Sequence, residues 1–486
     1  MNQPIRIHPQ NPKLFEFRGR PLVLVCATEH YGAVINRDFN FERYLEDAAE
    51  KSQTLTRLFM LFRELQTPIN PYSTCKPEST EFVSPYPRTG HELAMDGLPK
   101  FDLSQWNDEF FDRLHQFISL ASDHGVVVEV VLLSNTYQES LWELNPFHPS
   151  NNMNELPELD WTKYNTLLHP ELFERQCALV RKVVEELNPY DNVFFEICNE
   201  PGSYEDLTKV DEWQEEIHQQ ICEIEKSLPN KHLIAATKSC EVDPECSAGG
   251  RAYDSFVWDI VNVHPWSPAC YRDKHYDMGK FMSGDLNLEP VRDFCLDTYG
   301  ESKPVNLDED NVASRFRDLH GWTVHRKRAW TTLLSGGHYD FIDFSITIHT
   351  PTGTDESNRY IRTWMKHLSE FVHSLDLIRS RPLRGFLSGQ PVSTVASVMG
   401  VPGEDYVIYL ADGREKGDSD SGSSLSGSIQ MNLPESQYVV RTYSPTTGRY
   451  SPDVIHRLSG VVSLELPVFE HDVVLRLTAV NALAHV

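Results

Sequence analysis

Short apolar runs and longer amphipathic segments alternate over most of the chain. The apolar runs are rich in β-branched and aromatic residues, have the length of buried strands, and lie at residues 22–27, 54–62, 126–133, 192–198, 233–237, 256–263, 303–309 and 334–345. Apolar residues recur at helical spacing between most of these runs, at residues 41–52, 108–123, 171–187, 211–226, 290–299 and 322–334. Eight strands separated by helices, with a last helix over residues 358–375, predict an α/β fold, a (β/α)8 TIM barrel.

The pattern changes near residue 379. From there on, short strands follow one another at the spacing of an antiparallel β-sandwich, at residues 392–398, 406–410, 429–433, 438–443, 461–466 and 473–477. A segment rich in Gly, Ser and Asp, residues 413–427, predicts a flexible loop among them. We therefore predict two domains, a catalytic barrel over residues 1–378 and an accessory β-sandwich over residues 379–486.

Acidic residues stand where two of the predicted barrel strands end. Asn199 and Glu200 close the fourth strand, and three acidic residues, 308–310, close the seventh. Because the loops after the strands build the site of such a barrel, these carboxylates are expected at its mouth. Strand alternation predicts that Glu309 points to the opposite side from its two neighbours. The sequence leaves open whether Asp308 or Asp310 assists or replaces Glu309.

One arginine lies inside an otherwise apolar strand. Arg57 belongs to the run at residues 55–59. An unpaired guanidinium in that position would be costly, because burial removes its hydration. We therefore expect Arg57 to pair with a buried carboxylate inside the barrel.

These strand-end motifs resemble those of clan A retaining glycoside hydrolases, the group that includes the family 5 cellulases and mannanases. The Asn-Glu-Pro of residues 199–201 resembles the acid/base motif on the fourth strand of that clan. The stretch that begins with Lys-Pro-Val at residue 303 and ends at Glu309 resembles the nucleophile motif on the seventh strand.

The resemblance implies roles for four residues. Glu200 is the expected acid/base and Glu309 the expected nucleophile of a retaining β-glycosidase. Asn199 is expected to hydrogen-bond the sugar 2-hydroxyl, and Arg57 is expected to keep the pKa of Glu309 low. A carbohydrate is the expected substrate, with neither a metal nor a cofactor.

Further residues at predicted strand ends are candidates for substrate binding: His30, Tyr31, Asn135, His264, Trp266 and Asp343. Aromatic rings stack on pyranose faces, and imidazoles hydrogen-bond to hydroxyls or carboxylates. Clan A enzymes often carry a tyrosine near the end of strand six that contacts the nucleophile, and no obvious tyrosine stands there in this chain. Residues 329–345 and the strands after residue 379 also resemble barrel hydrolases with a small β-domain of the collagen-binding type.

Charge and composition limit the partners. The chain has 44 basic and 71 acidic residues, a net charge of −27, and no basic run, so we expect neither a nucleic acid nor a membrane partner. No signal-like or membrane-length apolar segment occurs, and the nine scattered cysteines form no disulfide pattern, so we expect a cytoplasmic protein. The sequence leaves open whether the protein forms a homo-oligomer. Long rim insertions at residues 63–100 and 138–165 favour short substrates and exo action.

Two other functions compete with a glycosidase. A metal-dependent barrel hydrolase is suggested by the 20 histidines, but only Glu29 and His30 stand at the end of the first strand, where a pair of histidines is typical. A carbohydrate-binding barrel without activity is the second alternative. The sequence contains no glycine-rich phosphate loop and no Gly-x-Ser-x-Gly motif.

Overall fold

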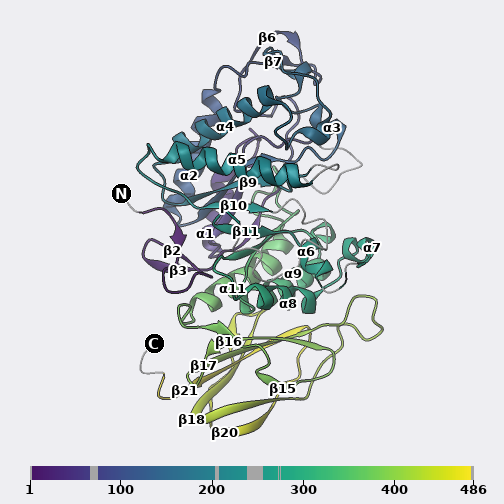
Figure 1. The fold of residues 1–486 in the computed structure, drawn as a ribbon. Helices are drawn as coiled ribbons and strands as arrows, with labels where there is room; N and C mark the ends of the chain where they lie inside the picture. The colour runs from purple at the N-terminus through teal and green to yellow at the C-terminus, as the bar shows by residue number, and fades with distance from the viewer. Residues whose placement is uncertain are drawn as a thin grey trace.

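The computed structural model describes residues 3–65, 75–202, 207–237, 256–271, 273 and 275–482. Figure 1 shows a barrel in the upper part of the molecule and a separate sheet below it. Among the described residues, no helix is long and apolar enough to cross a lipid bilayer.

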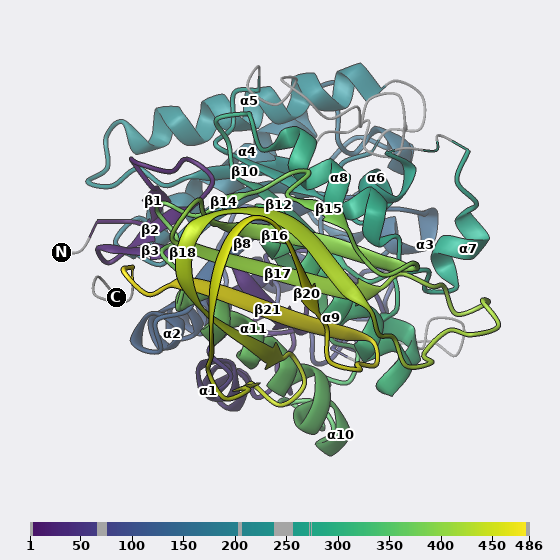
Figure 2. The same cartoon turned by 90° about the horizontal axis from the view of Figure 1, so that it is seen from below.

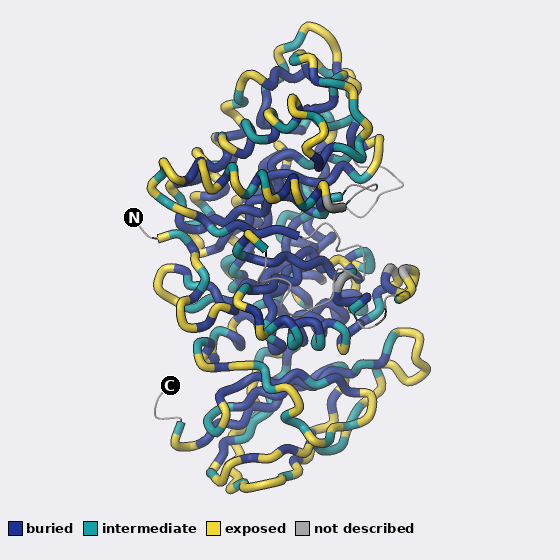
Figure 3. The backbone as a smooth tube through the Cα atoms, in the orientation of Figure 1, coloured by how far each residue is buried: buried dark blue, intermediate teal, exposed yellow. Residues whose placement is uncertain are grey.

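The predicted parallel barrel is confirmed. Its strands pair in the order β4-β13-β12-β11-β10-β9-β8-β5. They are β4 (Val25–Thr28), β5 (Leu55–Phe59), β8 (Val127–Ser134), β9 (Val193–Asn199), β10 (Ile234–Thr237), β11 (Ile260–Val263), β12 (Val305–Asp310) and β13 (His338–Ile342). The backbone N–H of Thr54 donates to the carbonyl of Val25 over 3.1 Å, which links the two ends of this order. All eight strands are buried, and they form the dark centre of Figure 3.

Helices pack around the barrel because one face of each is apolar. In α1 (Phe41–Glu50), Phe41, Tyr44 and Leu45 are buried, and the Asn40 side chain caps the first turn by accepting from the Arg43 N–H. The other helices are α2 (Asp108–Asp123), α3 (Glu139–Trp142), α4 (Pro170–Leu187), α5 (Leu207–Glu225), α6 (Trp266–Cys270), α7 (Met278–Met282), α8 (Leu288–Thr298), α9 (Leu319–Leu334), α10 (Asp355–Ser357) and α11 (Thr363–His373). Short turns of helix occur at η1 (Pro149–Asn151), η2 (Trp161–Lys163), η5 (Ser314–Phe316) and η6 (Asn358–Arg362).

Two small sheets lie at the ends of the barrel. At the amino-terminal end of the strands, β1 (Arg6–Ile7), β2 (Phe15–Phe17) and β3 (Arg20–Leu22) form a plug whose phenylalanines pack against the first residues of the barrel strands. In the rim insertion at residues 63–100, β6 (Arg88–Leu93) pairs with β7 (Pro99–Phe101). With the amino-terminal end plugged, the carboxyl ends of the strands are left to build a site.

The carboxyl-terminal strands form a separate antiparallel sheet, as predicted, and Figure 2 shows how strongly it curls. Its strands are β14 (Arg381–Pro382), β15 (Leu387–Gly389), β16 (Thr394–Val401), β17 (Asp405–Asp412), β18 (Ser428–Ser444), β19 (Arg449–Tyr450), β20 (Val454–Glu465) and β21 (Asp472–Ala479). The prediction of two strands at residues 429–433 and 438–443 is wrong, because both belong to β18. The register of β18 shifts between Leu433 and Ser436, around Pro434, which has no N–H to donate.

The curled sheet shares a hydrophobic core with the barrel helices. Trp330 of α9 stacks on Tyr409 of β17, with ring centroids 5.5 Å apart and an interplanar angle of 19°. Arg326 of α9 donates two hydrogen bonds, of 2.8 and 3.1 Å, to the carboxylate of Asp472 in β21. Both of these side chains are only 2% exposed. The sheet is therefore held to the barrel by buried contacts.

Arg326→Met is expected to lower the free energy of unfolding by about 3–5 kcal/mol, because it leaves the Asp472 carboxylate buried without its cation. Urea denaturation measures the change. The matched control is Arg379→Met, whose ion pair with Glu404 is exposed, and it should change stability little. Equal effects of the two substitutions would contradict a structural role for the buried pair.

Candidate active site

A cavity of about 410 Å³ opens at the carboxyl ends of the barrel strands. Glu200 and Glu309 both line it. The remaining lining residues are His30, Tyr31, Phe62, Glu64, Lys76, Tyr137, Gln138, Leu141, Asn311, Val312, Arg315 and Phe344. A larger groove of about 800 Å³ between α9, η6 and the curled sheet contains neither glutamate. The smaller cavity is therefore the one that carries the candidate chemistry.

Four residues of this cavity have an unusual backbone. Tyr31, Tyr137, Glu200 and Glu309 have φ angles of 65°, 55°, 45° and 54°, in the left-handed region that residues other than glycine rarely adopt. Each such residue costs of order 1–3 kcal/mol and persists only where the surrounding structure enforces it. Such strain clusters at functional sites, and its concentration here marks the cavity as one.

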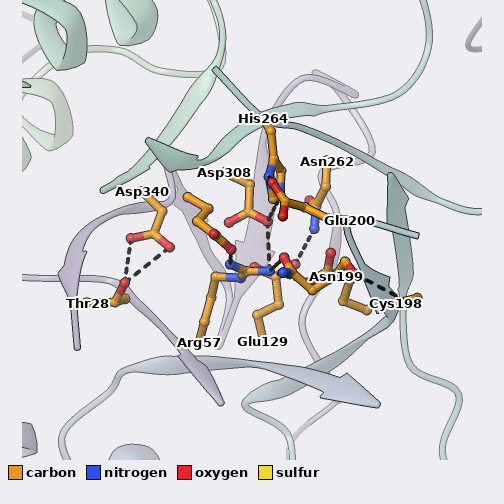
Figure 4. Close-up of polar contacts among 12 residues, drawn as sticks. Thr28, Arg57, Glu129, Cys198, Asn199, Glu200, Asn262, His264, Asp308 and Asp340 are labelled. Atoms are coloured by element: carbon orange, nitrogen blue, oxygen red, sulfur yellow. Dashed lines mark hydrogen bonds and ion pairs between the residues drawn. The ribbon is translucent and has the colours of Figure 1, made fainter. Parts of the chain in front are cut away.

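The two glutamates face each other. One carboxylate oxygen of Glu200, one of Glu309 and a ring nitrogen of His264 all lie within 4.8 Å of one another. The Nδ1 atom of His264 is 2.8 Å from Glu200 Oε1, as Figure 4 shows. The Glu200 side chain is 38% exposed and that of Glu309 only 5%, so Glu200 is the more open of the two.

Arg57 lies beneath this pair. Its Nη1 donates to Glu309 over 2.8 Å, and Glu309 is the carboxylate that we expected it to contact. Its Nη2 donates to Glu196 over 2.5 Å and to the Oδ1 of Asn199 over 3.1 Å. The Asn199 amide in turn donates to the Tyr137 hydroxyl over 2.8 Å, and Asn199 is fully buried. Asn199 therefore orients Tyr137 and is not among the residues that line the cavity, and its contact with a sugar stays a prediction.

Further buried carboxylates surround the same guanidinium, and of these sequence reasoning missed Glu129 and Glu196. Asp308 is 3.1 Å from Arg57 Nη2, and Glu129 is 3.6 Å from Nε (Figure 4). Glu196 completes the set. A signal was present in the sequence, because each acidic residue interrupts or ends an apolar strand run. One arginine thus faces four carboxylates, counting Glu309.

Burial, and to a lesser degree the neighbouring carboxylates, shift these carboxyl groups toward their neutral forms. Burial, together with the charge of Glu196, raises the pKa of Glu129 to about 8. Burial raises the pKa of Asp340 to about 7 and that of Asp308 well above its usual range, although Arg57 opposes both shifts. The barrel interior therefore holds protons at neutral pH.

The expected alternation at residues 308–310 is wrong. Asp308 and Glu309 both contact Arg57, whereas Asp310 accepts 2.6 and 2.9 Å hydrogen bonds from Arg328 and the Tyr339 hydroxyl. The register between β12 and β13 shifts between Leu307 and Asp310, and the positive φ of Glu309 turns its side chain out of the strand pattern. Asp310 is thus placed away from Arg57.

The pKa values of the two cavity glutamates depart from expectation. Burial and the charge of Glu200 raise the pKa of Glu309, although His264 and Arg57 oppose the shift. Burial also acts on Glu200, but the combined interactions with His264, Tyr137 and Arg57 outweigh it and lower the pKa of that carboxyl. Arg57 therefore does not keep the pKa of Glu309 low in the free protein. The pair titrates as one unit, since each charge acts on the other.

A tyrosine does stand near the expected nucleophile, but it comes from elsewhere than strand six. Tyr31 follows β4 and lies close enough to Glu309 for the two to influence each other's pKa, although its hydroxyl makes no hydrogen bond within 3.5 Å. His30 packs on the Tyr31 ring with centroids 3.9 Å apart and also lines the cavity.

Three other predicted residues lie outside this lining. Asn135 accepts a hydrogen bond from the Tyr137 N–H, and Asp343 accepts from Ser357 Oγ over 2.7 Å. Trp266 packs edge-on against Phe281. Among the described residues, none of these three side chains lines the cavity with the glutamates. Their part in substrate binding stays a prediction.

The buried carboxyls give the protein a pH-dependent stability. Glu129, with a pKa near 8, and Glu29 and Asp340, with pKa values near 7, keep protons that the unfolded chain releases above about pH 4.5. This stabilisation is complete below the unfolded pKa and is lost as the pH rises through the folded pKa. The contribution of these three carboxyls to the free energy of unfolding should therefore fall between about pH 5 and pH 8, whereas buried His325 and His338, with pKa values near 4, contribute stability that rises between about pH 4 and pH 6.5.

Glu129→Gln tests this relation, since an amide mimics the protonated carboxyl. The variant should match the wild type at pH 5 and exceed it at pH 8 by an amount on the order of a few kcal/mol, measured by chemical denaturation. The control is Glu465→Gln, an exposed position, which should keep the wild-type pH dependence. A Glu129→Gln variant that is less stable than the wild type at pH 8 would contradict the assignment.

The cavity groups also have the composition of a cation site. Glu200, His264 and Glu309 each offer one ligand atom, as do Glu129, Glu196 and Asp308 deeper in the barrel. Carboxylates and imidazole are ordinary ligands of divalent metals. Arg57 contacts a carboxylate of both groups, however, and a guanidinium disfavours a second cation beside it.

Solved structures share this architecture. A glycoside hydrolase matches 99% of the chain and 98% of its own length at 12% identity, with a TM-score of 0.61. A glycoside hydrolase of family 5 from Bacteroides vulgatus ATCC 8482 matches 98% of the chain and 93% of its own length at 12% identity, with a TM-score of 0.62. A structure from the same organism, described as a putative glycoside hydrolase, matches 99% of the chain and 83% of its own length at 11% identity, with a TM-score of 0.62. The chain has the fold of these glycoside hydrolases.

Sequence comparisons add one match. A family model described as a domain of unknown function, DUF6298, matches residues 80–165. No curated protein sequence matches the chain. The DUF6298 segment includes β8 with Glu129, and Tyr137 and Gln138 of the cavity wall. It therefore supplies one side of the cavity that contains Glu200 and Glu309.

Proposed function

We propose that the protein is a retaining glycosidase that cleaves β-glycosidic bonds in short carbohydrates. The observation that carries the proposal is the approach of Glu200 and Glu309, whose carboxylate oxygens lie within 4.8 Å at the mouth of the barrel. Retaining enzymes use two carboxyl groups roughly 5 Å apart, whereas inverting enzymes leave room for a water between them. The fold of family 5 glycoside hydrolases supports the same conclusion.

In the proposed mechanism, a Glu309 oxygen attacks the anomeric carbon while Glu200 gives its proton to the departing glycosidic oxygen. A covalent glycosyl ester on Glu309 results. Glu200, now a carboxylate, takes a proton from water, and the hydroxide formed displaces Glu309 from the sugar. Arg57 supports Glu309 as a carboxylate leaving group through the 2.8 Å hydrogen bond.

Productive binding requires a change in the proton affinities of the two glutamates. In the free protein the pKa of Glu309 is raised and that of Glu200 is lowered, whereas this mechanism starts with the proton on Glu200. His264 is hydrogen-bonded to Glu200 and within 4.8 Å of a Glu309 oxygen, so it can relay this proton when a sugar covers the cavity. Tyr137 and Tyr31, held at the cavity wall, are the proposed contacts to the sugar.

The cavity supports exo action on short substrates. Its walls include Glu64 and Lys76, from the rim insertion at residues 63–100, and Gln138 and Leu141, from the insertion at residues 138–165. Both insertions thus enclose the space beside the glutamates. Robust internal cleavage of an intact polysaccharide would contradict this part of the proposal.

The test is the stereochemical course of hydrolysis by the wild type. A panel of aryl α- and β-glycosides identifies a substrate, and proton NMR follows the anomer that is released first. We expect the β-anomer from a β-glycoside. Initial release of the α-anomer would exclude the retaining mechanism, and turnover of α-glycosides alone would exclude the β-specificity.

A metal-dependent hydrolase is the second candidate, favoured by the ligand geometry of Glu200, His264 and Glu309. Incubation with EDTA, followed by addition of Zn²⁺, Mn²⁺ or Mg²⁺, separates the two functions. A retaining glycosidase keeps its activity in EDTA. Activity that is lost in EDTA and restored by one ion would instead establish metal-dependent chemistry.

A further inference from the structure

We propose that another cavity of this protein binds a small oxyanion, a phosphate or a sulfate, through Lys327, Lys416 and His320. This cavity has a volume of about 270 Å³ and lies between helix α9 and the loop at residues 413–427 of the accessory sheet. It shares no lining residue with the cavity that contains the two glutamates. The inference is therefore independent of the proposed glycosidase activity.

Basic side chains line this cavity from both domains. Helix α9 supplies His320 and Lys327, whose spacing of seven residues puts them on one face of the helix. The accessory sheet supplies Arg414, Lys416 and His471. We call these five residues the basic pocket. Among the described residues that line the cavity there is no Asp or Glu, although the chain carries a net charge of −27. Such a lining favours an anion over a cation.

Lys327 is buried in the basic pocket and has hydrogen-bond donors to spare. It is 4% exposed, and its Nζ donates a 2.8 Å hydrogen bond to the backbone carbonyl of Asp412, whereas an ammonium group has three donors. In the part of the chain that the structure describes, no carboxylate forms an ion pair with it. Burial lowers the pKa of Lys327 to about 8, although the charges of Asp412 and Asp472 oppose the shift. A buried ammonium ion without a paired anion is costly, so an oxyanion at its free donors would stabilise it.

His320 and Lys416 offer further donors beside one aromatic ring. The Lys416 Nζ lies 4.9 Å from the centroid of the Phe316 ring, and the centroid of the His320 ring lies 5.7 Å from the same point. The Nε2 atom of His320 is buried and has no hydrogen-bond partner among the described residues. Burial lowers the pKa of His320, and the charge of Lys416 adds to the shift, so the two groups interact. An oxyanion that accepts a hydrogen bond from Nε2 would recover the free energy that this unpartnered atom costs.

The carboxylates that act on Lys327 are bound to other groups. Asp412 accepts 2.7 and 3.0 Å hydrogen bonds from Arg414, and Asp472 belongs to the buried pair described above. Glu415 accepts 2.7 and 3.2 Å hydrogen bonds from the backbone N–H groups of residues 286 and 287. These last contacts anchor the loop at residues 413–427, which we predicted to be flexible, against the barrel. The loop thereby closes one side of the basic pocket.

The volume of the cavity limits the ligand. It is smaller than the roughly 300–1,000 Å³ of pockets that hold drug-sized molecules, so it suits an oxyanion alone or one that carries a small organic group. Lysines bind phosphate groups as point charges, without the fixed geometry of an arginine fork. The ligand is therefore either an inorganic ion or the phosphate or sulfate ester of a small sugar.

Isothermal titration calorimetry with sodium phosphate, sodium sulfate and a hexose 6-phosphate, at an ionic strength fixed with sodium chloride, tests the site. We expect saturable binding of one ion per chain, and the compound with the lowest Kd distinguishes a free ion from a sugar ester. Lys327→Gln should raise this Kd at least about tenfold. Lys416→Gln, at an exposed position, should raise it roughly 3- to 10-fold.

Urea denaturation gives an independent measurement. At constant ionic strength, phosphate should raise the free energy of unfolding of the wild type, and Lys327→Gln should lose this dependence. Denaturation without phosphate shows whether Lys327→Gln folds, and the exposed Lys416→Gln decides the question if it does not. Lys226→Gln is the matched control, because Lys226 is exposed and does not line the cavity. It should bind phosphate as the wild type does.

The inference would be overturned if none of the three compounds bound saturably to the wild type at millimolar concentrations. An unchanged Kd in both Lys327→Gln and Lys416→Gln, or an equal rise in the Lys226→Gln control, would overturn it as well. No glycoside takes part in these measurements. Their result therefore stands whether or not the protein hydrolyses one.

Discussion

Glu309→Ala lowers kcat/KM by at least about a thousandfold, because the variant lacks the carboxylate that attacks the anomeric carbon. Azide fits into the space that the side chain leaves and attacks the substrate directly. The expected product is a glycosyl azide of inverted configuration, formed at a rate that rises with azide concentration. Kinetics with an activated aryl glycoside, followed by NMR of the product, measure both effects.

Glu200→Ala gives the complementary result. An aryl glycoside with a good leaving group still forms the glycosyl enzyme, and azide then releases it as a glycosyl azide of retained configuration. The two products thus assign the two roles independently. Glu143→Ala, in the rim insertion but outside the cavity lining, is the control and should keep wild-type kinetics.

The pKa directions make an exchange of roles the sharpest alternative. Glu309 has the raised pKa and Glu200 the lowered one, which by themselves suit an acid at 309 and a nucleophile at 200. The hydrogen bond from Arg57 to Glu309 argues for the original assignment. Inverted azide product from Glu200→Ala and retained product from Glu309→Ala would establish the exchange. Full activity in both variants would show that neither carboxyl takes part in the mechanism.

Arg57→Met destabilises the protein by about 3–5 kcal/mol and abolishes activity, because its four carboxylate partners lose the cation that they share. The loss of unfolding free energy should be larger at pH 8 than at pH 5. Without Arg57 the folded pKa values of these acids rise further, so more of the stability disappears as the pH rises through them. Chemical denaturation at both pH values measures this difference.

Arg57→Lys separates charge from geometry. A lysine restores the positive charge but cannot hold Glu309, Glu196 and Asn199 through separate guanidinium nitrogens. We expect part of the stability to return while activity stays low. Arg181→Met, at an exposed ion pair on α4, is the control and should change neither property appreciably. An active Arg57→Met variant would show that the arginine is only structural.

Local sequence patterns determined the architecture and the first outline of the site. Apolar runs and helical spacing are set by which faces a segment must bury, so they locate the eight strands of the barrel and most of its helices. Asn199, Glu200 and Glu309 stand at strand ends, and Arg57 stands inside an apolar strand, so each is visible in the sequence as a departure from the pattern around it. These signals need no knowledge of distant residues.

Only the tertiary structure decided which groups meet. Glu129, Glu196 and Asp308 converge on Arg57 because closing the sheet brings strands from distant parts of the chain around one axis. Tyr31 was expected at the end of the first strand, but its proximity to Glu309 depends on the closed barrel, and the positive φ of Glu309 breaks the alternation that the sequence predicted. The pKa values of Glu200 and Glu309 depend on burial and mutual charge, which exist only after folding.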